Sequence, residues 1–91
     1  MKKMPRRDKL KIYGDILFSL NDSRHEKIVL SHIQHKTNVP FDRLKIYLSE
    51  LEDLGLIKQD PKLYLTDKGK QYLSDYEKVL EFMNRMGLSY S

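Results

Sequence analysis

The stretch FDRLKIYLSELEDLGLI, residues 41–57, decides the fold of this chain. Its apolar residues recur every three or four positions, which is the spacing of one face of an α-helix. Pro40 suits the first helical position, because its fixed backbone angle is helical and no donor is needed there. Gly55 suits the left-handed residue just past a helix end, with Leu56 making the accompanying apolar contact. The pattern predicts a helix over 40–54. Its apolar stripe consists of Phe41, Leu44, Tyr47, Leu48, Leu51 and Leu54.

Two further helices are predicted upstream. Apolar spacing of three and four predicts a helix over about 7–20, with Asp8 in the first turn, where a carboxylate favours the helix dipole. Ser23, with a glutamate three residues later, forms a capping-box pattern for a helix that ends near His35. The adjacent apolar residues of this segment also permit a strand. The tight turn expected at 37–40, which leads into the next helix, favours the helical alternative.

Downstream, the sequence predicts a small hairpin followed by a long helix. Residues 56–59 and 63–65 are short extended pieces around the turn Asp60-Pro61-Lys62. Such a hairpin is stable only when it packs against other elements. Thr66 can cap the last helix, which is predicted over 67–86.

The last helix carries an apolar seam whose residues step by four and three. A helix of this length measures about 30 Å, as long as a small domain is wide, so its far half has little of its own chain to cover it. We therefore expect the seam to pair with a second copy, although packing within one subunit is the alternative. The expected interface residues are Tyr72, Tyr76, Val79, Leu80, Met83 and Met86.

Composition excludes several classes of protein. The 91 residues suffice for one domain, and the absence of cysteine excludes a disulfide framework and a thiolate zinc site. The three histidines have no nearby ligands to complete a metal site, and no phosphate-binding loop or catalytic spacing is present. We predict no enzyme activity, no metal and no other cofactor. No apolar run is long enough for a signal peptide or a membrane span, so we expect a cytoplasmic location.

Positive charge is concentrated near the N-terminus. The residues concerned are Lys2, Lys3, Arg6, Arg7, Lys9 and Lys11, with Asp8 as the single acid among them. A basic arm on a nearly neutral body indicates a polyanionic partner, either nucleic acid or an anionic membrane. A solubilising tail is the alternative. The helix beside the arm lacks a polybasic amphipathic face with exposed aromatic residues, which disfavours the membrane.

The order of helix, helix, turn, helix, hairpin and long helix resembles the small archaeal winged helix-turn-helix DNA-binding proteins. The resemblance is carried by the leucine ladder of 41–51, by Gly55-Leu56-Ile57 and by Leu65-Thr66-Asp67-Lys68-Gly69. It covers about residues 8–73 and is more specific for the fold than for the DNA bound. Some members of that group add a C-terminal helix that forms an antiparallel coiled-coil dimer, which implies a homodimer here.

The expected fold class is mainly α with a small β-hairpin, a winged helix-turn-helix followed by a long C-terminal helix. Residues 1–7 form a basic N-terminal arm in this scheme. Residues 8–66 form the winged helix-turn-helix domain, and residues 67–91 form the dimerisation helix and tail.

In a helix-turn-helix, the N-terminal residues of the second helix of the pair meet base edges in the major groove. Arg43 is the strongest candidate, because a guanidinium bonds guanine O6 and N7 together, and Ile46 suits a thymine methyl group. The acidic Glu50, Glu52 and Asp53 are expected to face away from the DNA backbone. The base-reading candidates are Asp42, Arg43, Lys45, Ile46 and Ser49. The phosphate candidates are Arg6, Arg7, Lys9, Lys27, Lys36, Thr37 and Asn38, and the wing candidates are Lys58 and Lys62.

The sequence thus predicts a homodimeric protein that binds double-stranded DNA, with helix 40–54 in the major groove. Its role would be that of a transcriptional regulator or a chromatin-associated protein of the nucleoid. The alternative is a winged-helix protein–protein interaction module without DNA binding. The acidic second half of helix 40–54 and the minimal wing support that alternative.

Overall fold

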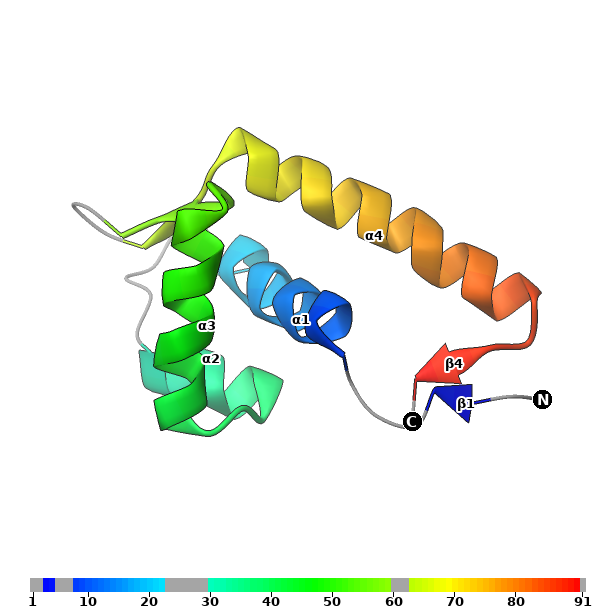
Figure 1. Cartoon of the computed structure of the whole chain (residues 1–91), viewed down its shortest axis with the longest axis horizontal. Coiled ribbons are helices and arrows are strands. Elements are labelled where there is room, and N and C mark those ends of the chain that lie inside the picture. Colours follow the sequence, from blue (N-terminus) through cyan, green and yellow to red (C-terminus); the bar gives the residue numbers. More distant parts are fainter. Residues whose placement is uncertain (1–2, 5–7, 23–29, 60–62, 91) are drawn as a thin grey trace.

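The computed structural model describes residues 3–4, 8–22, 30–59 and 63–90. Their elements are β1 (Lys3–Met4), α1 (Lys9–Asp22), α2 (Leu30–Thr37), α3 (Phe41–Asp53), β2 (Ile57–Lys58), β3 (Tyr64–Leu65), α4 (Asp67–Arg85) and β4 (Ser89–Tyr90). The molecule measures 44 × 26 × 24 Å, with α2 and α3 toward one end and α4 running along its length (Figure 1). The expected fold class, mainly α with a small antiparallel hairpin, is confirmed.

The first helix starts two residues later than expected and runs two residues further. Asp8 lies just before α1, where its carboxylate accepts a hydrogen bond from the Lys11 N–H at 3.0 Å. It therefore caps the helix rather than occupying its first turn, and satisfies one of the four amides that have no partner within the helix. On the inner side of α1, Ile16 and Leu17 are fully buried.

The turn between α2 and α3 lies one to two residues later than the sequence suggests. The predicted start of the second helix at Ser23 lies outside the described residues, but α2 continues past His35 to Thr37. Asn38 ends it with a positive φ of 57°, a conformation that asparagine tolerates better than most residues. Pro40 is the N-cap of α3 rather than its first residue.

The end of α3 confirms the predicted role of Gly55. Its φ of 80° turns the chain, and its N–H donates to the carbonyl of Glu52 at 2.9 Å. The Leu56 N–H donates to the Leu51 carbonyl at 3.0 Å, which completes a Schellman motif, and the Leu56 side chain is buried. The predicted stripe is wrong at its two ends, because Phe41 and Leu54 are 42% and 47% exposed.

The predicted hairpin and helix cap are both present. Strands β2 and β3 pair antiparallel, with Ile57 opposite Leu65. The Thr66 hydroxyl accepts from the Gly69 N–H at 3.1 Å and donates to the Gly55 carbonyl at 2.6 Å. One side chain thus caps α4 and also binds the turn that ends α3.

The core joins all of the longer elements. Its fully buried side chains are Ile16, Leu17, Ile33, Leu44, Leu51 and Ile57. The first half of α4 packs across α1, where the Tyr76 ring lies over Gly14. A Cβ added at Gly14 would overlap the Tyr76 ring, so this packing of the two helices leaves no room for a side chain at position 14.

A short parallel pair that the sequence does not suggest joins the two ends of the chain. Lys3 pairs with Ser89 and Met4 with Tyr90, so β1 lies beside β4 after the chain has turned back at the end of α4. This pair lies at the opposite end of the molecule from α3 (Figure 1). The start of the predicted arm is therefore placed away from α3.

Candidate nucleic-acid interface

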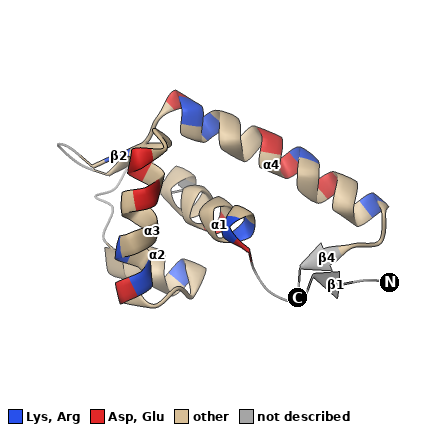
Figure 2. Ribbon diagram, viewed as in Figure 1, with Lys and Arg blue, Asp and Glu red and all other residues tan. Residues whose placement is uncertain are grey.

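The outer face of α3 carries every base-reading candidate. Leu44, Leu48 and Leu51 occupy its buried side, and the candidates Asp42, Arg43, Lys45, Ile46 and Ser49 are all exposed. The charged residues of the first half of the helix are two cations and one acid, whereas those of the second half are all acids (Figure 2). The Lys45 ammonium lies 5.4 Å from the centre of the Phe41 ring, within the range of a cation–π contact.

The phosphate candidates that the structure describes differ in exposure. Lys36 and Asn38 are exposed at the end of α2, and Lys58 is exposed on the hairpin. Thr37 must be corrected, because it is buried and its hydroxyl donates to the Ile33 carbonyl at 2.7 Å. The two additional residues of α2 cause this, since they take Thr37 out of the loop and onto the inner face of a helix. Arg6, Arg7, Lys27 and Lys62 lie outside the described residues.

Lys9 is exposed, but it is paired with an acid. Its ammonium lies 3.2 Å from the Glu50 carboxylate, so the start of α1 is joined to the second half of α3. Exposed pairs of this kind contribute little stability, and a phosphate can compete for the lysine.

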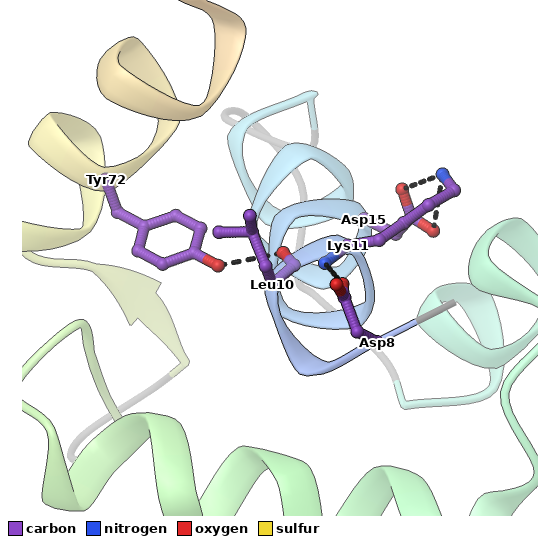
Figure 3. A network of polar contacts seen from close by, with 5 residues as sticks. All are labelled: Asp8, Leu10, Lys11, Asp15 and Tyr72. Atoms are coloured by element: carbon purple, nitrogen blue, oxygen red, sulfur yellow. Dashed lines mark hydrogen bonds and ion pairs between the residues drawn. The ribbon is translucent and has the colours of Figure 1, made fainter. Parts of the chain in front are cut away.

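Local polar contacts of Asp8, Leu10 and Lys11 hold the first turns of α1 (Figure 3). The Tyr72 hydroxyl donates to the Leu10 carbonyl at 2.8 Å and ties this turn to α4. Lys11 and Asp15 form an ion pair at 3.1 Å along the helix. Lys11, which belongs to the basic run near the N-terminus, thus already has an acidic partner.

A hollow of about 250 Å³ lies between the start of α1 and the flank of α3. Its lining residues are Lys9, Arg43, Ile46, Tyr47 and Glu50. At its edge the Tyr13 hydroxyl donates to Glu50 Oε1 at 2.5 Å. The hollow brings a guanidinium, an ammonium and a carboxylate together beside one apolar and one aromatic side chain.

These contacts shift the protonation of both partners. The hydrogen bond from Tyr13, followed by the contact with Lys9, holds the pKa of Glu50 below its ordinary value. Burial, followed by the hydrogen bond to Glu50 and the charge of that carboxylate, raises the pKa of Tyr13 to about 12. Near neutral pH, Glu50 is an ionised acceptor and Tyr13 is a neutral donor.

Sequence reasoning did not assign Glu50 or Tyr13 to the site. From the sequence, Glu50 is predicted only as an acid that faces away from the DNA backbone. One signal was available, because Arg43, Tyr47 and Glu50 have the spacing i, i+4, i+7 and so share one side of a helix. The contact of Glu50 with Tyr13, 37 positions away, has no such signal.

The predicted dimer seam must be corrected. Tyr76 and Met83 are 2% and 8% exposed, so both are covered within the chain, and the Tyr76 ring lies 6.2 Å from that of Phe18. Tyr72 and Leu80 are partly buried. The large apolar side chains that remain exposed on α4 are Val79, Phe82 and Met86, at 38%, 52% and 58%.

Two further findings concern the part of the chain that the structure describes. None of its helices combines the length and the apolar character needed to cross a membrane. Within the same residues, no three side chains of histidine or acid type come together in a way that would hold a metal ion. His25 lies outside this part.

Comparison with known proteins agrees with the architecture. The family model described as winged helix-turn-helix matches residues 6–84, a range that holds α1, α2, α3, the hairpin and all of α4 except its last residue. No curated protein and no solved structure matches the chain significantly. The match spans most of the chain and coincides with the observed order of helices, hairpin and long final helix. The chain therefore belongs to the winged helix-turn-helix family.

Proposed function

We propose that this protein binds double-stranded DNA as a homodimer, with α3 in the major groove, and acts as a transcriptional regulator or a chromatin-associated protein of the nucleoid. The observation that carries the proposal is the exposed first half of α3, which presents Arg43, Lys45 and Ile46 within a fold that is typically a DNA-binding one. The major groove, about 12 Å wide, admits a helix of this kind.

The surroundings of α3 support this arrangement. Lys36 at the end of α2, Lys58 on the hairpin and Lys9 at the start of α1 lie on the three elements around α3 and are exposed. Phosphate contacts from such positions fix the orientation of a protein on a duplex, while the residues of α3 meet the base edges. Each phosphate neutralised adds about 0.9 to the slope of log affinity against log salt concentration.

The exposed apolar strip on α4 supports the homodimer. Val79, Phe82 and Met86 have the spacing i, i+3, i+7 and so lie on one side of the helix. A second copy would cover these side chains, which are otherwise in water. A symmetric dimer predicts half-sites about 34 Å apart, or a multiple of that distance, on one face of the duplex.

DNA binding is tested by gel shift at two salt concentrations with random duplexes and with duplexes selected from a random pool. Arg43→Ala is expected to cost about 1–3 kcal/mol on a selected site and clearly less on random DNA, because a bidentate contact to guanine is lost. Arg85→Ala is the matched control, since Arg85 is an exposed cation at the far end of α4. Its affinity should stay close to that of the wild type.

Two outcomes would contradict parts of the proposal. An equal loss for Arg43→Ala on random and selected DNA would make Arg43 a phosphate contact instead of a base-reading residue. The absence of binding to any duplex at low salt would overturn DNA binding altogether. It would favour a protein–protein interaction module, for which the exposed acids Glu52 and Asp53 on α3 are the supporting observation.

A further inference from the structure

Glu50 lines the same hollow as Arg43, on the flank of α3 that faces the start of α1. An acid so close to a DNA-facing surface needs an explanation, because a carboxylate repels phosphate. Its two described contacts come from α1: the Tyr13 hydroxyl at 2.5 Å and the Lys9 ammonium at 3.2 Å. The acid is thus held in one place, and its charge is partly offset by the lysine beside it.

The carboxylate retains capacity for a further hydrogen bond. An ionised carboxylate offers about four acceptor positions and no donor. Tyr13 donates to Oε1. The ammonium of Lys9, a side chain that is 64% exposed, donates to both oxygens, at 3.3 Å to Oε1 and 3.2 Å to Oε2. Among the described residues, the partner of Lys9 is Glu50 in this exposed pair, so the ammonium can move to a phosphate when DNA binds. Oε2 would then face the hollow as an acceptor of fixed orientation.

The geometry points to Glu50 as a specificity-determining residue, which accepts a hydrogen bond from the amino group of a cytosine while Arg43 donates to a guanine. This inference rests on the proposed binding of DNA through α3. In the major groove, cytosine presents only its N4 donor, whereas guanine presents two acceptors that repel a carboxylate. Adenine places its N7 acceptor beside its N6 donor, so it is a poorer partner for an acid than cytosine.

The spacing along α3 sets the register of this preference. Arg43 and Glu50 are seven residues apart, which is about 10.5 Å along a helix axis. Successive bases are about 3.4 Å apart along a strand, so the distance corresponds to about three base-pair steps. The two residues would therefore contact different base pairs, with the cytosine preferred about three positions from the guanine.

The test compares the sites that wild type, Glu50→Gln and Glu52→Gln select from a random duplex pool. Glutamine at 50 keeps a carbonyl oxygen for the Tyr13 hydroxyl, so the packing of α1 on α3 is retained, and thermal unfolding verifies this. Glu52→Gln removes the same charge from the same helix. Glu52 is exposed, is bonded to Gln59 and lies about 200° around the helix axis from Glu50.

We expect wild type and Glu52→Gln to select a cytosine about three positions from a guanine, with about tenfold discrimination against other bases there. Glu50→Gln should replace that cytosine by adenine, since a glutamine amide pairs with adenine N6 and N7 together. Glu50→Ala should show no preference at that position, while the guanine contacted by Arg43 stays selected.

Two results would overturn the inference. The first is that Glu50→Gln still selects the cytosine, or that Glu50→Gln and Glu52→Gln gain the same affinity on all sequences. Glu50 would then act only through its negative charge, without reading a base, and the proposed DNA binding would be unaffected. If the wild-type protein selects no duplex at low salt, the proposed function fails and this inference fails with it.

Discussion

The two halves of α4 belong to one continuous amphipathic helix, yet they differ in what they contact. The first half is capped by Thr66, bonded to α1 through Tyr72 and packed over Gly14 through Tyr76. The second half buries Met83, but leaves Phe82 and Met86 more than half exposed. One continuous apolar pattern can therefore pack within the chain at one end of a helix and leave apolar side chains exposed at the other.

The largest effect is expected where the first half packs against α1. Tyr76→Ala should lower the free energy of unfolding by about 4 kcal/mol, because it removes a buried aromatic side chain and leaves a cavity above Gly14. Urea denaturation measures this loss, and Ser74→Ala on the exposed side of α4 should stay within about 0.5 kcal/mol of wild type. A loss below about 1 kcal/mol for Tyr76→Ala would remove the contrast between the two halves.

Substitutions in the second half of α4 are expected to weaken dimerisation and to have little effect on folding. Phe82→Ala is expected to weaken dimerisation by about 2 kcal/mol, or about 30-fold, as for a central apolar residue of an interface. Sedimentation over a range of protein concentrations measures the change. Glu81→Ala, on a different side of α4, is the control and should leave the dimer intact. A wild-type protein that stays monomeric at all concentrations would contradict the proposed homodimer.

The smallest effect concerns one hydrogen bond between α4 and α1. Tyr72→Phe keeps the ring but removes the donor to the Leu10 carbonyl, so we expect a loss of about 1 kcal/mol in unfolding free energy. Tyr64→Phe on the exposed strand β3 is the matched substitution and should have less effect. Equal losses for the two variants would show that the Tyr72 hydroxyl stabilises the protein no more than the exposed hydroxyl of Tyr64 does.

Elements whose ends depend on local chemistry were predicted well from the sequence. Gly55 and Thr66 each act through contacts with a few neighbouring residues, and both were assigned correctly. Thr37 was misplaced because the end of α2 depends on Asn38 adopting a left-handed conformation, which the sequence permits but does not demand. The fold class followed from these local signals combined with the helical periodicity.

Features that depend on distant residues were not predictable in this way. Tyr76 was assigned to a dimer seam because the periodicity of α4 says nothing of Gly14, 62 positions earlier, over which its ring packs. The pairing of β1 with β4 joins two strands of two residues, too short for any pattern. The contact between Tyr13 and Glu50 likewise depends on how α1 crosses α3. In each case the missing information is the relative placement of two elements.

The double hydrogen bond of Thr66 has a consequence for altering this protein. Since its hydroxyl binds both Gly55 and Gly69, Thr66 links the turn that ends α3 directly to the first turn of α4. We therefore expect the orientation of α4 relative to α3 to be kept when the sequence between Lys58 and Tyr64 is lengthened or exchanged. If α3 binds DNA as proposed, a longer and more basic connection at this point would extend the reach of the protein along a duplex without reorienting α4.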